Sequence, residues 1–182
     1  MSGFADRLAA LAASTDRRVM ALHDSYAAGR ITAEEFVELA EQVLNAGQER
    51  AAAVADVAAA AVAGSALGGV LLPLGAARPS LAELAAEVDA QDPVGRPLRT
   101  LLDDRAAISV EAQDRVKVTG QAVLKRALRE HGVKKWRRRL DGGACELCRK
   151  LAGTELPMTA RMYRHRNCGC TTQPVTSKEN DQ

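Results

Sequence analysis

Residues 32–63, TAEEFVELAEQVLNAGQERAAAVADVAAAAVA, form the most strongly helical part of the chain. Thr32 with Glu35 three places later matches a capping box, in which each side chain satisfies a backbone N–H at the start of a helix. Apolar residues then recur at helical spacing, and strong helix formers continue through Ala51–Ala63. This pattern predicts one long helix that ends within Gly64–Leu74, where glycines and a proline accumulate.

Helical patterns also lie on both sides of this stretch. Apolar spacing predicts a helix over Phe4–Ala28, and a second capping box opens a short helix over Ser80–Ala90. A further long helix is expected over Leu98–His131, with Gly132 as its stop. The sequence therefore predicts a mostly α fold, in which residues 1–130 form a helical domain or arm.

The composition limits how such helices can pack. Of the 182 residues, 47% are apolar but only 3% are aromatic, so the core must consist of Ala, Val and Leu. Alanine permits close helix approach but buries little area per residue, so a cross-link or a partner surface would add needed stability. The mixed, charge-containing sequence excludes collagen, mucin-like stalks and wholly disordered chains.

Val57–Ala77 carries no charge over 21 residues, which is long enough to span a membrane. Most of these residues are Ala and Gly, however, and membrane insertion favours Leu and Ile far more strongly. We therefore expect an alanine-rich helix packed against neighbouring helices, and no membrane span.

Charge divides the chain into two parts. Residues 1–124 contain 11 Lys/Arg and 17 Asp/Glu, whereas residues 125–182 contain 14 and 6. The stretch 125–139 is the most basic, and three interpretations remain open for it: contact with phosphate, a solvated helix end, or docking to an acidic protein surface. The candidates for contact with phosphate or an acidic partner are Lys134, Lys135, Arg137, Arg138 and Arg139.

The cysteines and one histidine form a compact motif near the C-terminus. It reads Cys145-x2-Cys148, then His165-x2-Cys168-x-Cys170, and it contains every cysteine of the chain. Thiolates and a neutral imidazole are ligands that Zn²⁺ prefers in a closed tetrahedron. We therefore predict a zinc site of Cys145, Cys148, His165 and Cys168, with Cys170 as the alternative ligand, in a reducing compartment.

This zinc is expected to be structural. Four protein ligands leave no open coordination position, and no histidine or carboxylate is obviously spare, since His23 and His131 lie far off in the sequence. We therefore predict no catalytic residue and no enzyme. Residues 131–176 would form a small zinc-stapled domain with short β elements, followed by a disordered tail at 177–182. A zinc-containing nucleic-acid-binding protein and a treble-clef nuclease are the alternatives.

The C-terminal motif resembles the signature of the MuF-like minor capsid proteins, which take part in head morphogenesis of tailed bacteriophages. The resemblance covers residues 136–175, and the helical remainder agrees in architecture only. One departure is Arg166, where the family often has proline after the histidine. The matching residues are Trp136, Arg138, Leu140, Asp141, Cys145, Cys148, Leu151-Ala152-Gly153, His165, Cys168, Cys170 and Pro174-Val175.

This resemblance implies a structural virion protein rather than an enzyme. Its expected partners are the portal protein, the major capsid protein or both, with non-specific contact to packaged DNA as a further expectation. The protein would be made in the cytoplasm of the bacterial host and reside in the phage head near the portal vertex.

Overall fold

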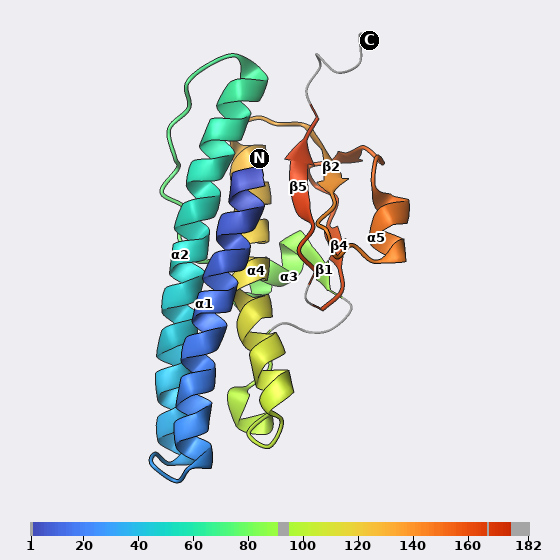
Figure 1. Cartoon of the computed structure of the whole chain (residues 1–182). Helices are drawn as coiled ribbons and strands as arrows, with labels where there is room; N and C mark the ends of the chain where they lie inside the picture. The colour runs from blue at the N-terminus through green and yellow to red at the C-terminus, as the bar shows by residue number, and fades with distance from the viewer. Residues whose placement is uncertain (1, 91–94, 167, 176–182) are drawn as a thin grey trace.

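Three long helices lie side by side and form the body of the molecule (Figure 1). The structure is a computed structural model that describes residues 2–90, 95–166 and 168–175. The long helices are α1 (Ser2–Ala27), α2 (Ala33–Leu67) and α4 (Arg105–Glu130), and a small β-containing unit packs against one side of them. The predicted mostly α fold with short β elements near the C-terminus is confirmed.

Helix α2 begins and ends where its sequence predicts. The Thr32 hydroxyl accepts a hydrogen bond from the Glu35 backbone N–H at 3.2 Å, and the Glu35 carboxylate accepts one from the Thr32 N–H at 2.7 Å. At the other end Gly68 adopts a left-handed conformation with φ of 76°. Glycine has no Cβ to oppose this conformation, so it terminates the helix at low cost.

Small residues allow α2 to pack tightly against α1 and α4. Seven alanines of α2 are buried: Ala40, Ala51, Ala52, Ala55, Ala59, Ala60 and Ala63. At two glycines, Gly47 of α2 and Gly120 of α4, an added Cβ would lie within 3 Å of a side chain of α1. The composition predicts a core that buries little apolar area per residue. The short distances between the helices compensate for this.

The segment between α2 and α4 differs from its prediction in two places. Helix α3 (Leu81–Glu87) stops before Ala90, because Val88–Ala90 forms strand β1, which pairs in parallel with β4 (Met162–Arg164). The predicted helix from Leu98 is instead a single 3₁₀ turn, η1 (Leu98–Thr100). Helix α4 starts only at Arg105, because the Asp104 carboxylate caps it by accepting from the Ala107 N–H at 2.8 Å.

The C-terminal unit is built around strand β2 (Lys135–Arg139). This strand lies between β3 (Leu156–Pro157) and β5 (Thr171–Pro174), antiparallel to both, and a short helix, α5 (Glu146–Leu151), follows it in the chain. Trp136 of β2 is 1% exposed, and its indole N–H donates to the Pro157 carbonyl at 3.0 Å. The chain's one tryptophan therefore anchors this sheet to the rest of the core.

One hydrophobic core extends across the predicted boundary at residue 130. It contains alanines of α2 and leucines of α4 together with Trp136, Met158 and the buried cysteines of the C-terminal unit. Strand β5 contacts both α4 and α2. The division into domains at residue 130 stays a prediction, and the expected disordered tail at 177–182 lies outside the described residues.

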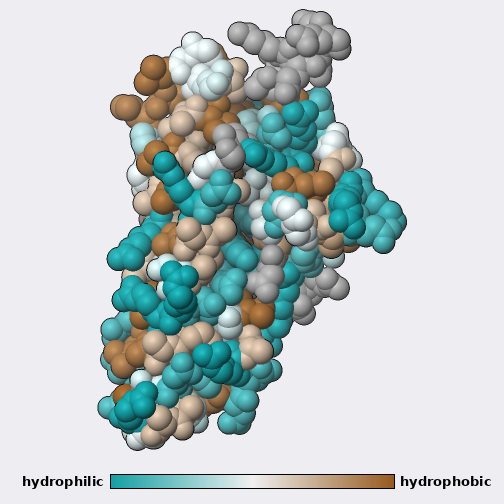
Figure 2. Space-filling model, viewed as in Figure 1, coloured by the Kyte–Doolittle hydropathy of each residue, from teal (hydrophilic) through white to brown (hydrophobic). Residues whose placement is uncertain are grey.

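The end of α2 and the segment after it carry exposed apolar side chains. Leu67 is 57% exposed, Val70 95% and Leu72 77%, and Figure 2 shows apolar residues on the surface at this end of the helix. Helix α2 is long and apolar enough to cross a membrane, but 44% of its most apolar window is buried inside the protein. Core helices of soluble proteins share these properties, so the absence of a membrane span stays a prediction.

Candidate metal centre

The cysteines and His165 come together from two segments of the C-terminal unit. Cys145 is the N-cap of α5, where its sulfur accepts a hydrogen bond from the Cys148 backbone N–H at 3.4 Å. His165, Cys168 and Cys170 lie in the connection between β4 and β5. A helix N-terminus and a loop between two strands thus bring their donor side chains close together.

The donor atoms form two overlapping groups of three. Cys145, Cys148 and His165 make one group, and Cys148, Cys168 and Cys170 make the other; within each group the donor atoms lie within 4.8 Å of one another. The Cys148 and Cys168 sulfurs are 3.9 Å apart. In a tetrahedral zinc site with Zn–S bonds of about 2.3 Å, two sulfurs are about 3.8 Å apart, so this pair already has the required separation.

His165 has one ring nitrogen ready for a ligand. Its Nδ1 lies 2.8 Å from the Arg166 carbonyl, so Nδ1 carries the proton and donates it. Its Nε2 is buried and has no hydrogen-bond partner. A buried, unpaired acceptor nitrogen costs free energy unless something binds it, and metal-bound histidines have this same arrangement of a fixed Nδ1–H and a coordinating Nε2. The residues present therefore fit a zinc ion.

The thiols differ in their proton affinity. Burial raises the pKa of the Cys148 thiol to about 11, so a metal ion would have to displace its proton. A hydrogen bond from Cys170 lowers the pKa of Cys168 to about 5, and the same bond raises the pKa of Cys170, the donor. A hydrogen bond from the Cys148 N–H lowers the pKa of Cys145. Cys168 therefore gives up its proton more readily than Cys170 does.

Helix α4 fixes the loop that carries two of these cysteines. The buried Gln121 amide donates to the carbonyls of Cys168 at 3.2 Å and of Cys170 at 2.7 Å. Arg164, which is 1% exposed, pairs with Asp114 of α4 at 3.0 Å. Sequence reasoning missed both contacts, because they join residues that lie 47 to 50 positions apart in the chain.

The five basic candidates do not share one environment. Lys134 and Lys135 are exposed, and Arg137 and Arg139 are half-buried. Arg138 is only 5% exposed, and its guanidinium faces the cysteines rather than solvent. The prediction that Arg138 contacts phosphate or an acidic partner does not agree with this placement, because alternation along β2 turns its side chain inward, beside Trp136.

Other basic residues of the 125–139 stretch are paired within the chain. Lys125 is buried and bridges to Glu87 at 2.7 Å, and Arg129 contacts the same carboxylate group at 2.8 Å. Arg126 pairs with Glu83 at 3.3 Å. The acidic surface that this part of the stretch contacts is therefore helix α3 of the same protein.

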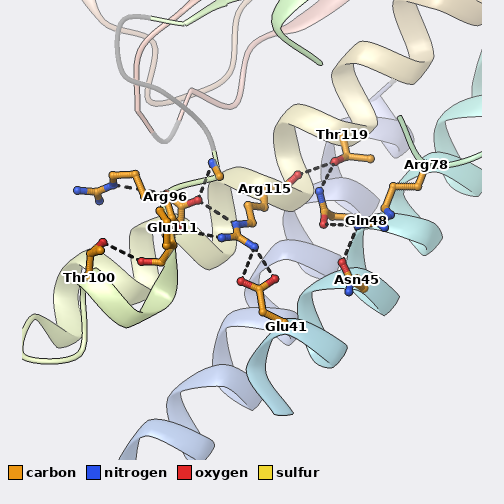
Figure 3. A network of polar contacts seen from close by, with 11 residues as sticks. Glu41, Asn45, Gln48, Arg78, Arg96, Thr100, Glu111, Arg115 and Thr119 are labelled. Atoms are coloured by element: carbon orange, nitrogen blue, oxygen red, sulfur yellow. Dashed lines mark hydrogen bonds and ion pairs between the residues drawn. The ribbon is translucent and has the colours of Figure 1, made fainter. Parts of the chain in front are cut away.

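A second polar cluster, which contains no cysteine, lies between α2, α4 and the segments around α3 (Figure 3). It lines a cavity of about 530 Å³. Arg115, whose side chain is 8% exposed, pairs with Glu41 at 2.7 Å and Glu111 at 2.9 Å, and it donates to the Arg96 carbonyl at 2.7 Å. Arg78 is held by two side-chain amide oxygens of α2. Since the charges around Arg115 are balanced within the chain, we interpret the cluster as a structural contact that holds these segments together.

Comparison with family models, with curated proteins and with solved structures gave no match to this chain. The cysteine and histidine geometry is therefore the basis for the functional argument.

Proposed function

We propose that this chain is a structural zinc protein, in which one Zn²⁺ is bound by Cys145, Cys148, His165 and Cys168. The observation that carries the proposal is the buried, unpaired Nε2 of His165 beside the clustered sulfurs. All four cysteines are free thiols. Three thiolates and an imidazole complete a tetrahedron and leave no position for a substrate, so the metal would stabilise the fold rather than catalyse a reaction.

The geometry also explains what the zinc would stabilise. Helix α5 has six residues and β4 has three, which are too few to be stable through their own hydrogen bonds. One metal ion would join the start of α5 to the β4–β5 connection. The free energy of metal binding would then become free energy of folding for the C-terminal unit.

We also propose that this protein is a minor capsid protein in the head of a tailed bacteriophage. The support is the resemblance of residues 136–175 to the MuF-like signature together with the long helical body, which offers extended surfaces for a portal or major capsid protein. Copurification with the portal protein encoded by the same genome is the direct test. Failure of the two proteins to associate at micromolar concentration would count against this role.

The metal assignment is tested by zinc analysis of the purified chain and of two histidine variants. We expect one zinc per chain in the wild type and in His131→Gln, and a loss of zinc in His165→Gln. His131 is a matched control because it is also half-buried but lies at the end of α4. Wild-type protein that folds without zinc, or His165→Gln with its full zinc content, would refute the proposed site.

A zinc-containing nucleic-acid-binding protein is the second candidate, and one observation favours it. Lys135, Arg137 and Arg139 alternate with the inward-facing residues of β2, so they share the outward face of one strand. Such a surface would contact the phosphates of DNA, and the affinity of that contact would fall steeply with salt. Binding that is sequence-specific at moderate salt would favour this candidate over the capsid role.

A further inference from the structure

Arg138 is a buried cation whose position a surface role does not explain. Its guanidinium Nη1 lies 3.6 Å from the Cys148 sulfur and 3.8 Å from the Cys168 sulfur, and Nη2 donates to the Tyr163 carbonyl. Its Nε is buried and has no partner. Among the described residues, no carboxylate lies within ion-pair distance of Arg138. The nearest groups able to carry negative charge are therefore the two cysteines.

A guanidinium in this position needs a nearby negative charge. Arginine stays protonated in proteins, and an uncompensated buried charge costs several kcal/mol. Two thiolates on either side of Nη1 would supply that charge. The contact distances are those of N–H donors to sulfur, so Arg138 would hydrogen-bond to ligand sulfurs without leaving its place.

The proposed metal centre in turn needs a nearby positive charge. With the ligand set proposed above, on which this inference rests, three thiolates and one Zn²⁺ leave a net charge of −1 in the interior. Arg164 also lies near Cys168 and donates to its carbonyl at 3.4 Å, but its guanidinium is already paired with Asp114. Arg138 contacts two of the three thiolate ligands and brings the net charge of the centre to zero.

We propose that Arg138 is the counter-ion of the metal centre, a positioning residue that holds the Cys148 and Cys168 thiolates together by hydrogen bonds to both sulfurs. One residue would thus join strand β2 to both cysteine-bearing segments. The metal affinity of the chain then depends on this arginine as well as on the four ligands.

The test compares the zinc affinity of Arg138→Gln, Arg138→Lys and Arg139→Gln with that of the wild type, by competition with a chromophoric chelator. Partners outside the ligand shell typically change metal affinity about 10–100-fold, so Arg138→Gln should bind zinc weaker by that factor. Arg138→Lys should be intermediate, because it keeps the charge but loses the planar donor pair. Arg139→Gln removes the same charge from the same strand and should bind as the wild type does.

Equal affinities of Arg138→Gln and the wild type would overturn the inference, whereas a wild type without zinc would first overturn the proposed site. A second measurement does not depend on the variants folding. In wild-type protein loaded with ¹¹³Cd, hydrogen bonds through sulfur should produce a scalar coupling between the metal and a guanidinium proton of Arg138. Absence of this coupling, when couplings to cysteine protons are visible, would also contradict the proposal.

Discussion

At the scale of single residues, Cys148 is the centre of the candidate metal site. It is the only residue present in both groups of donors, it is fully buried, and burial raises the pKa of its thiol. Cys170, by contrast, has another partner, since its thiol lies 3.6 Å from a carboxylate oxygen of Asp141. The five candidate donors therefore differ in how well they suit the four coordination positions.

We expect Cys168→Ser and Cys170→Ser to differ in metal content. Cys168→Ser removes a ligand thiolate and should lose zinc, whereas Cys170→Ser keeps a donor beside Cys168 and should retain one zinc per chain. Cobalt substitution gives the measurement, because the charge-transfer intensity of Co²⁺ reports the number of thiolate ligands. Equal loss of intensity in both variants would assign Cys170 to the first coordination sphere.

The clustering of the cysteines with His165 could be predicted from the sequence, but the inward position of Arg138 could not. Spacing alone brings two cysteines to one turn, and zinc chemistry then selects the rest. Whether a charged residue faces water depends on which face of a short strand is buried. The one available signal was Trp136, since a strand that buries its tryptophan turns the residue two places later to the same side.

At the scale of elements, the bundle depends on the close approach of α1 and α2 at Gly47. A Cβ at Gly47 would lie 2.7 Å from the Thr15 hydroxyl oxygen. Thr15 cannot easily move aside, because it is β-branched and its hydroxyl donates to the Leu11 carbonyl at 3.0 Å. The helices therefore meet at a point where even one methyl group has no space.

Gly47→Ala should lower the free energy of unfolding by about 1–3 kcal/mol, the usual cost of overpacking. In a Thr15→Ala background most of this penalty should disappear, because the two nearest atoms are gone and only the Val116 methyl at 3.2 Å remains close. Alanine also favours the helix by about 1 kcal/mol over glycine. Urea unfolding of the four proteins measures the coupling. Gly3→Ala is the control, since nothing lies within 4 Å of its added Cβ; strictly additive effects at residues 15 and 47 would contradict the packing argument.

Element boundaries show where sequence reasoning succeeded and where it failed. The start of α2 was predictable because a capping box is local, with both partners within four residues. Strand β1 was not, because Val88–Ala90 pairs with residues more than 70 positions later, and only the folded C-terminal unit supplies that partner. Asp104, the residue that caps α4, was a local signal for the start of that helix. The apolar residues around Leu98 also follow helical spacing, and they led to a predicted start that was too early.

At the scale of the whole molecule, the metal centre and the helices share contacts as well as a core. Gln121 holds the carbonyls of two cysteines, and the shared core runs from the alanines of α2 to Trp136. Loss of metal should therefore weaken the helical body, not only the C-terminal unit.

Chelation of zinc should lower the melting temperature seen by two probes at once. Far-ultraviolet circular dichroism reports the helices, and fluorescence of Trp136 reports the C-terminal unit. If free zinc is held at 100 times its dissociation constant, the metal adds about 2.7 kcal/mol, which is about 5–10 °C for a chain of this size. Coincident transitions with and without zinc are expected; a shift of the fluorescence transition alone would establish two independent domains.

The core shared across residue 130 also limits how this protein could be recombined. A portable module carries its own core, so it can be grafted onto another chain at a linker. Here a graft of residues 131–175 would leave Trp136 and the cysteine loop without the α4 and α2 surfaces that cover them. The smallest transferable unit therefore includes α4 and its α2 contact, and natural exchange of the C-terminal segment between proteins would require a matching helical body.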